Sequence, residues 1–152
     1  MALFNIRVYG ILKDSNNRVL VTDEFIRGNY FTKFPGGGLE FGEGTRECLK
    51  REFKEEANLD VEIGEHIYTT DFFQISAFNN IDQIVSIYYF ASTKEPIRLH
   101  TKTRPFDFEP HQVADITGTC EVFRWIEWDE FTENTVSLPI DKVVVKMLKD
   151  SH

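Results

Sequence analysis

The sequence has little of what marks a secreted, membrane-embedded or disulfide-stabilised protein. Its 152 residues include only two cysteines, Cys48 and Cys120, which form no CxxC pair. This usage is typical of a reduced, cytoplasmic protein. No apolar run is long enough to span a bilayer, and the first residues lack the basic start and apolar stretch of a signal peptide. We therefore expect no membrane partner.

Positive charge is also in deficit. The chain carries 17 Lys and Arg residues against 25 Asp and Glu residues, a formal net charge of −8. This excess argues against a broad basic surface for the backbone of DNA. Small phosphate-bearing ligands remain compatible with it, provided that a bound cation mediates the contact.

Apolar residues are sufficient for a core. They make up 41% of the chain and include 14 phenylalanines, so one folded domain over residues 1–152 is expected. The pattern predicts a hairpin of two strands at 4–12 and 18–22, and a long loop at 93–118, of a length that is more often functional than idle. It also predicts further strands at 30–34, 61–76, 83–92 and 121–128, and helices at 45–57 and 141–149.

The helix at 45–57 has three sectors. At 100° per residue, Leu49, Phe53 and Ala57 form an apolar stripe. Glu47, Lys50 and Lys54 fall on the side expected to face water, and Thr45 and Asn58 are the expected caps. A third sector, spanning about 100°, is acidic. It holds Glu52, Glu55 and Glu56.

The acidic sector is costly for an isolated helix. Like charges at i,i+3 and i,i+4 destabilise by roughly 0.2–0.5 kcal/mol per pair. Glu55 and Glu56 also lie in the last turn, where the helix dipole disfavours anions. Three hard oxygen ligands on adjacent turns are what Mg²⁺ or Mn²⁺ would neutralise. We therefore interpret the sector as a metal site rather than as a solvated face.

A glycine run precedes this helix. Gly36, Gly37 and Gly38 would let the backbone pass close to a ligand, and we consider them candidate substrate-binding residues together with Lys33. The run is not a phosphate-binding P-loop, because no Gly-Lys-Ser/Thr ending follows it.

Residues 37–59 resemble the Nudix box. The family pattern has a glycine, five residues, a glutamate, seven residues, and then Arg-Glu-U-x-Glu-Glu-x-Gly-U, where U is a bulky apolar residue. Here Gly37 is followed at the family spacing by Glu43 and by Arg51-Glu52-Phe53-Lys54-Glu55-Glu56-Ala57-Asn58-Leu59. Only Asn58 departs from the pattern, in place of glycine.

The resemblance implies an α/β fold, namely an α/β/α sandwich with a mixed, largely antiparallel curved sheet and the Nudix loop–helix. It also implies Mg²⁺-dependent hydrolysis of a nucleoside diphosphate linked to another moiety. Glu52, Glu55 and Glu56 would be metal ligands, with Glu43 and the Gly37 carbonyl as accessory groups. Arg51 would orient a catalytic glutamate, and its spacing leaves both Glu43 and Glu55 open as partners. Several relatives use a later acidic residue as a ligand or base, a role that Glu121 would fill.

Several alternatives remain open at this point. The substrate could be a nucleotide-sugar or ADP-ribose, or instead a nucleoside triphosphate. A non-catalytic nucleotide-binding module of this fold would typically have lost box carboxylates, all of which are present. An isoprenoid diphosphate isomerase would need a His/Cys metal set that is not found. Because homodimers are common in the family, a homodimer is a further expectation.

Overall fold

A computed structural model describes residues 2–151, and its chain divides into two compact units. Unit 1 comprises Met1–Leu12 and Pro35–Ile97, and unit 2 comprises Lys13–Phe34 and Arg98–His152. Each unit contains one mixed four-stranded sheet and one longer helix. No helix of the described residues is long and apolar enough to cross a membrane.

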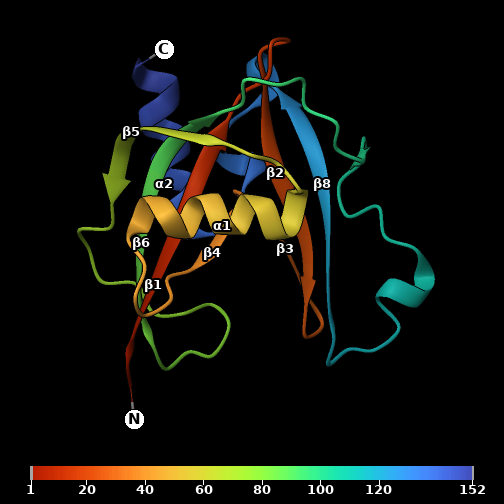
Figure 1. The fold of residues 1–152 in the computed structure, drawn as a ribbon. Helices are drawn as coiled ribbons and strands as arrows, with labels where there is room; N and C mark the ends of the chain where they lie inside the picture. Colours follow the sequence, from red (N-terminus) through yellow and green to blue (C-terminus); the bar gives the residue numbers. More distant parts are fainter. Residues whose placement is uncertain (1, 152) are drawn as a thin grey trace. The chain divides into compact units, whose positions relative to one another are not determined.

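Unit 1 contains the sheet with strand order β4-β1-β6-β5. Strand β1 runs parallel to β6 and antiparallel to β4, and β5 is antiparallel to β6. Helix α1 lies across this sheet (Figure 1). The elements are β1 (Phe4–Leu12), β4 (Gly36–Gly38), α1 (Thr45–Ala57), β5 (Glu62–Thr69) and β6 (Gln83–Ser92).

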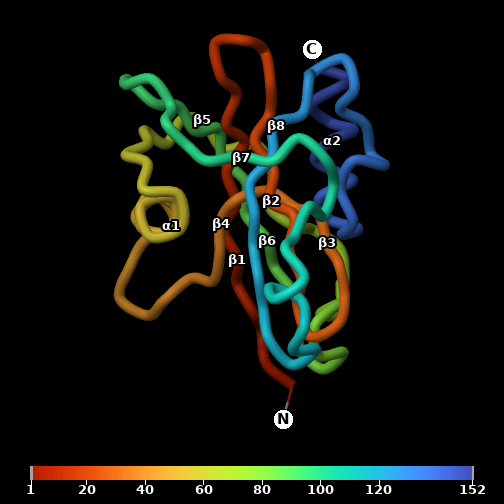
Figure 2. Tube along the Cα trace, turned by 90° about the vertical axis from the view of Figure 1, so that its right-hand side faces the viewer, coloured from red at the N-terminus to blue at the C-terminus, as the bar shows by residue number. Residues whose placement is uncertain are grey.

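Unit 2 contains the sheet with strand order β3-β2-β8-β7. The chain between Arg98 and Gly118, drawn in teal, runs beside β8 (Figure 2). The elements are β2 (Arg18–Ile26), β3 (Asn29–Lys33), β7 (Thr101–Lys102), β8 (Thr119–Glu127), α2 (Pro139–Ser151) and the short 3₁₀ turns η1 (Pro110–Gln112), η2 (Trp128–Glu130) and η3 (Glu133–Thr135).

Helix α1 forms where the sequence predicts it. Leu49, Phe53 and Ala57 are buried, and Phe53 packs where a side chain on Gly10 of β1 would otherwise lie. The helix begins after Gly44, whose N–H donates to the Glu47 carboxylate at 3.2 Å. The prediction of Thr45 as N-cap is therefore wrong by one residue: a backbone-to-carboxylate bond, not a hydroxyl, closes the first turn.

Three further sequence predictions need correction. The runs 4–12 and 18–22 form strands but no hairpin, because β1 and β2 pair in different sheets. The ladder pairing across the turn at 14–17 is the isolated bridge between Lys13 and Val19. Gly36–Gly38 is a strand instead of a loop, because it pairs with β1. Strand β5 ends at Thr69, well before residue 76.

The predicted fold class and most of the remaining predicted strands and helices agree with the structure. The fold is mixed α/β, and four of the six strand pairings among residues 2–151 are antiparallel. The strands predicted around 30–34, 83–92 and 121–128 are present as β3, β6 and β8, and the second predicted helix is α2. The loop at 93–118 contains only the short elements β7 and η1.

Candidate active site

Arg51 is the centre of the predicted site in unit 1. Its Nε and Nη2 donate to the two oxygens of Glu43 at 3.0 and 2.7 Å. Its Nη1 donates to Glu52 at 3.0 Å and to Glu55 at 3.2 Å, and Nη2 also donates to the Gly38 carbonyl at 3.2 Å. Both partners left open by the spacing are therefore used at once, because the guanidinium presents its donors in a planar fork.

Glu43 closes the loop between β4 and α1. Its carboxylate accepts the Glu40 N–H at 3.0 Å in addition to the two bonds from Arg51. The hydrogen bond from Arg51, followed by that from the Glu40 backbone, lowers the pKa of Glu43 to about 2. The same contact with Glu43 raises the pKa of Arg51 above its ordinary value. Both groups are thus charged throughout the physiological range.

Glu52 is packed against the glycine strand. It is buried, and a Cβ built on Gly37 would overlap its carboxylate. Gly37 lies opposite Val8 in the β1–β4 pair, so the sheet fixes the position of its backbone. Because position 37 has no side chain, the Glu52 carboxylate can lie against the Gly37 backbone. The predicted metal-binding roles of the two residues stay predictions.

Gly36 and Gly38 have different surroundings. Gly36 has φ +151°, and a Cβ there would overlap the Val8 carbonyl, so this position requires glycine. The Gly38 carbonyl faces the helix and accepts bonds from Arg51 and, at 3.5 Å, from the Cys48 thiol. Their predicted contact with substrate stays a prediction.

Glu55 and Glu56 are exposed on the last turn of α1. Glu55 reaches Arg51, as described above, and Glu56 follows it on the same exposed turn of the helix. Among residues 2–151, no group of three or more His, Cys, Asp or Glu side chains is gathered closely enough to hold a metal ion. The cation that neutralises this acidic sector in the structure is Arg51.

Cys48 is fully buried next to this cluster. Burial, together with the nearby Glu43 carboxylate, raises the pKa of its thiol to about 12. The thiol is therefore protonated at neutral pH and is a poor ligand for a hard cation. Its role is to fill space beneath Arg51.

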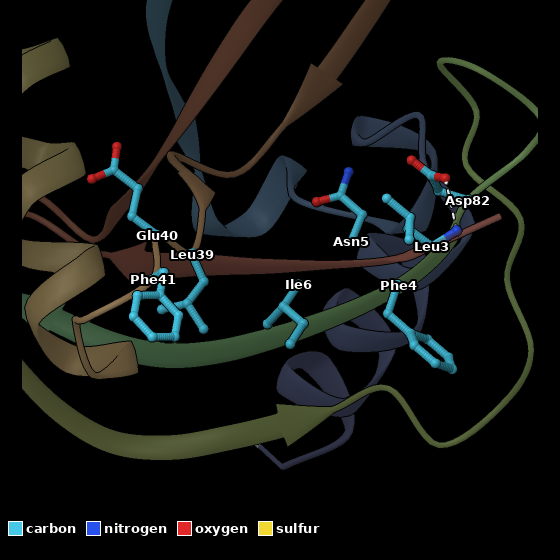
Figure 3. Close-up of a pocket in the computed structure, with 8 residues that line it drawn as sticks. All are labelled: Leu3, Phe4, Asn5, Ile6, Leu39, Glu40, Phe41 and Asp82. Atoms are coloured by element: carbon cyan, nitrogen blue, oxygen red, sulfur yellow. Dashed lines mark hydrogen bonds between the residues drawn. The ribbon is translucent and has the colours of Figure 1, made fainter. Parts of the chain in front are cut away.

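A shallow cleft of about 280 Å³ adjoins the loop that carries Glu40 and Glu43. In Figure 3 the side chains of Phe4, Ile6, Leu39 and Phe41 point to one side, and that of Glu40 points to the other. Glu40 lies 3.7 Å from the Arg51 guanidinium. The apolar side chains of Leu39 and Phe41 are therefore the chain neighbours of Glu40, which contacts the charged cluster.

Two predicted site residues belong to unit 2. Lys33 is buried at the end of β3, and its ammonium lies 3.2 Å from Glu24. Glu121 is half-buried in β8, and its Cα pairs with that of Glu24 across the sheet. Their predicted roles in binding and catalysis stay predictions.

A buried ion pair in unit 2 is absent from the sequence predictions. Asp23 of β2 and Arg124 of β8 are joined by two hydrogen bonds of 2.7 and 2.9 Å. A signal for it exists in the strand alternation. Asp23 occupies the apolar phase of Val19, Val21 and Phe25, and Arg124 that of Val122 and Ile126.

The comparisons with known proteins agree with this geometry. The family model described as NUDIX domain matches residues 3–147. A MutT protein from Methanosarcina mazei Go1 has a similar structure, with a TM-score of 0.69 and 13% identity over 99% of this chain and 96% of that chain. A NUDIX hydrolase from Nitrosomonas europaea gives 0.66 and 16% over 97% and 89%.

A third similar structure is a UDP-X diphosphatase. It gives a TM-score of 0.58 at 12% identity, and the match covers all of this chain but 64% of that one. At these identities the likeness establishes the fold. The match of the family model over nearly the whole chain establishes the family.

The chain therefore belongs to the Nudix family. It is a pyrophosphohydrolase, as the sequence resemblance implies. Enzymes of this family generally use a divalent metal and act on small-molecule nucleotide derivatives. The donor chemistry suits such an ion, because carboxylate oxygens are hard ligands, although the structure gathers no cluster of three such side chains within residues 2–151.

Proposed function

We propose that the protein is a Mg²⁺-dependent hydrolase that cleaves the diphosphate linkage of a nucleoside diphosphate joined to another moiety, of the nucleotide-sugar or ADP-ribose type. The observation that carries the proposal is the Arg51 cluster. One guanidinium holds Glu43, Glu52 and Glu55 together at the end of a glycine strand. A structural ion pair with Arg51 would need only one carboxylate. This arrangement gathers three, which together with a bound cation could contact a polyphosphate.

Glu52, Glu55, Glu56 and the Gly37 carbonyl would hold Mg²⁺ or Mn²⁺. When bound, such an ion offsets the charge of a diphosphate and lowers the pKa of a coordinated water. The carboxylates are oxygen ligands of the kind that Mg²⁺ prefers. The backbone carbonyl would add a neutral ligand that contributes no further negative charge.

The side chains of the chain itself would act in binding and proton transfer. The reaction adds water to one phosphorus and breaks the bond from that phosphorus to the bridging oxygen, giving two phosphate monoesters. The Glu55 carboxylate is exposed, and it would accept the proton of the attacking water. Arg51 would orient Glu55 through its i,i+4 contact, and Glu43 would orient Arg51.

A nucleoside triphosphate is the second candidate substrate. The similarity to a MutT protein supports this second class, and the similarity to a UDP-X diphosphatase supports the first. The two classes leave different products: two phosphate monoesters from a diphosphate-linked substrate, and a nucleoside monophosphate plus pyrophosphate from a triphosphate.

The testing experiment compares these classes on the full chain with Mg²⁺. Nucleotide-sugars and ADP-ribose are blocked at both ends, so a coupled phosphatase releases phosphate only after cleavage. For triphosphates the coupling enzyme is inorganic pyrophosphatase. We expect phosphate release from the nucleotide-sugars or ADP-ribose, and we expect a chelator to abolish this release. Turnover confined to the second arm would replace the proposed substrate class, and full turnover after exhaustive chelation would refute the metal site.

Two variants separate an enzyme from a non-catalytic nucleotide-binding module. Glu55→Gln and Glu56→Gln should each lower kcat by about 10²-fold or more, the usual scale for loss of a proton-transfer group or metal ligand. The matched control is Glu65→Gln, an exposed carboxylate of β5. Unchanged rates in both box variants would show that any hydrolysis arises elsewhere.

Four expectations about the setting of the protein accompany this proposal. The two cysteines are free thiols, which supports a reducing, cytoplasmic location. The net charge of −8 supports the expectation of no DNA partner. A homodimer and a single domain over residues 1–152 also stay predictions.

A further inference from the structure

The first residue of α1 is hydrogen-bonded to the sheet of unit 1. Thr45 Oγ1 lies 2.6 Å from the hydroxyl of Tyr89 in β6. This bond is not a helix cap, because the first turn is closed by the Gly44 N–H and the Glu47 carboxylate. The Thr45 hydroxyl therefore ties the start of the helix to β6 instead of completing the helix itself.

Tyr89 is held in place from both sides of its ring. The residue is buried, and the Arg46 guanidinium lies 4.7 Å from the ring centroid. The His66 ring makes a T-shaped contact with it, with the two centroids 5.7 Å apart. A buried tyrosine hydroxyl usually finds a hydrogen-bond partner, and here that partner is Thr45. The hydroxyl is thus a fixed point of the sheet against which α1 begins.

A β-bulge provides a second attachment for the start of α1. The register of the β5–β6 ladder shifts between Ile63 and His66. The Ile63 and Gly64 carbonyls both accept hydrogen bonds from Arg46 Nη1, at 3.0 and 2.8 Å. Bulges often re-aim groups next to active sites. This one ties the second residue of α1 to β5 and keeps its guanidinium over the Tyr89 ring.

Thr45 lies on the same side of α1 as Glu52. Glu52 follows Thr45 by seven residues, which is almost two full turns, so the two side chains differ in direction by about 20°. The Glu52 carboxylate has no slack, because a Cβ on Gly37 of β4 would overlap it. A rotation of α1 about its axis would therefore change the fit of Glu52 against β4.

The apolar face of α1 does not by itself set this rotation. Leu49 and Phe53 are buried against the sheet, but hydrophobic contacts are non-directional. The bond from Thr45 to Tyr89 is directional, and it acts two turns before Glu52. Because α1 lies across the strands (Figure 1), its start is fixed on β6 while Glu52 meets β4.

We propose that Tyr89 is a positioning residue for the hydrolysis, which acts through Thr45 to set the rotation of α1 and so the placement of Glu52 and Glu55. Arg46 supports this role by holding the tyrosine ring. The inference rests on the proposed function, because that function gives the box carboxylates their part in the reaction. A misplacement of about 1 Å can cost about 100-fold in rate, so the loss of one hydroxyl is measurable.

Tyr89→Phe tests the proposal, because it removes the hydroxyl and keeps the packed ring. We expect kcat at 25 °C to fall about fivefold or more while KM stays within about twofold, since the placement of the carboxylates acts on the transition state. Thr45→Val should show the same loss, and Thr45→Ser, which keeps a hydroxyl, should retain the wild-type kcat. The double variant with Tyr89→Phe and Thr45→Val should lose no more than either single variant, because both remove one bond.

The matched control is Tyr68→Phe, which removes a hydroxyl of β5 that donates to Asp71 at 2.6 Å. Amide chemical shifts of Glu52 and Glu55 need no turnover, and they should change in Tyr89→Phe but not in the control. Unchanged shifts, or a wild-type kcat with a lowered Tm in Tyr89→Phe, would overturn the inference and leave the proposed hydrolysis in place. Failure of the wild type to hydrolyse any substrate would instead refute the proposed function, and with it a role of Tyr89 in catalysis.

Discussion

Arg51 and Glu43 are joined by two parallel hydrogen bonds, Nε to Oε2 at 3.0 Å and Nη2 to Oε1 at 2.7 Å, across eight residues of sequence. A bidentate pair of this kind fixes both planes at once. It ties the end of the loop before α1 to the middle of the helix, and the remaining Arg51 donor group is thereby aimed at Glu52 and Glu55.

The first prediction concerns pH. The pKa of Glu43 is lowered to about 2 from an ordinary value of 4.5, principally by its hydrogen bond with Arg51. A depressed carboxyl pKa stabilises the folded state above the unfolded-state pKa, and this contribution is lost as the pH falls toward the folded-state value. The Tm difference between wild type and Glu43→Gln should therefore be full at pH 6–7 and shrink from about pH 4.5 to about pH 2. Thermal melts with chelator at five pH values check this, and a difference that is constant with pH would contradict it.

The second prediction concerns the space at Gly37. A Cβ at this position would overlap the Glu52 carboxylate, so Gly37→Ala must displace it. We expect a loss of about 1–3 kcal/mol in the free energy of unfolding and at least a tenfold loss of kcat. The control is Gly38→Ala, where the nearest atom, Arg7 Nη1, lies at an ordinary 3.5 Å. Equal behaviour of the two variants in urea unfolding and turnover would mean that the Glu52 contact is unimportant.

The third prediction concerns Asn58, the one departure from the box pattern. Asn58 caps α1 in the left-handed region, with φ 52° and ψ 37°, and its N–H donates to the Lys54 carbonyl at 3.1 Å. Asn58→Gly should be close to neutral, with a change below about 1 kcal/mol, because glycine adopts this conformation freely. Asn58→Val should be clearly worse, because a β-branched residue is strained at positive φ. Melting temperatures and kcat of the two variants decide, and identical values would argue against a conformational role.

The fourth prediction concerns Glu121, whose role no contact described above decides. If it supplies a late ligand or base, Glu121→Gln should lower kcat about 10²-fold with an unchanged Tm. Glu127→Gln, at the exposed far end of the same strand, serves as the control. Wild-type turnover in Glu121→Gln would redirect the search to Glu95 and Glu109 in the loop at 93–118.

The sequence by itself determined the features that depend on interactions between residues close together in the chain. The spacing of Leu49 and Phe53 predicts the buried face of α1, and the αL preference of asparagine predicts the end of the helix at Asn58. The box register from Gly37 to Leu59 was sufficient for the family, since its charged positions lie within one loop and one helix. Backbone preference and helical periodicity act over a few residues, so they can be recognised from the sequence.

The tertiary structure decided the pairings between distant segments. The turn at 14–17 suggested a hairpin, yet β1 pairs with β6, some 80 residues later, as Phe4 with Gln83 shows. The spacing left Arg51 with two open partners, and the fold of the loop let it bind both. Asp23 and Arg124, 101 residues apart, meet because β2 and β8 are neighbours in one register. Strand alternation says which residues share a face, but only the register, set by the packing of the whole sheet, says which of them touch.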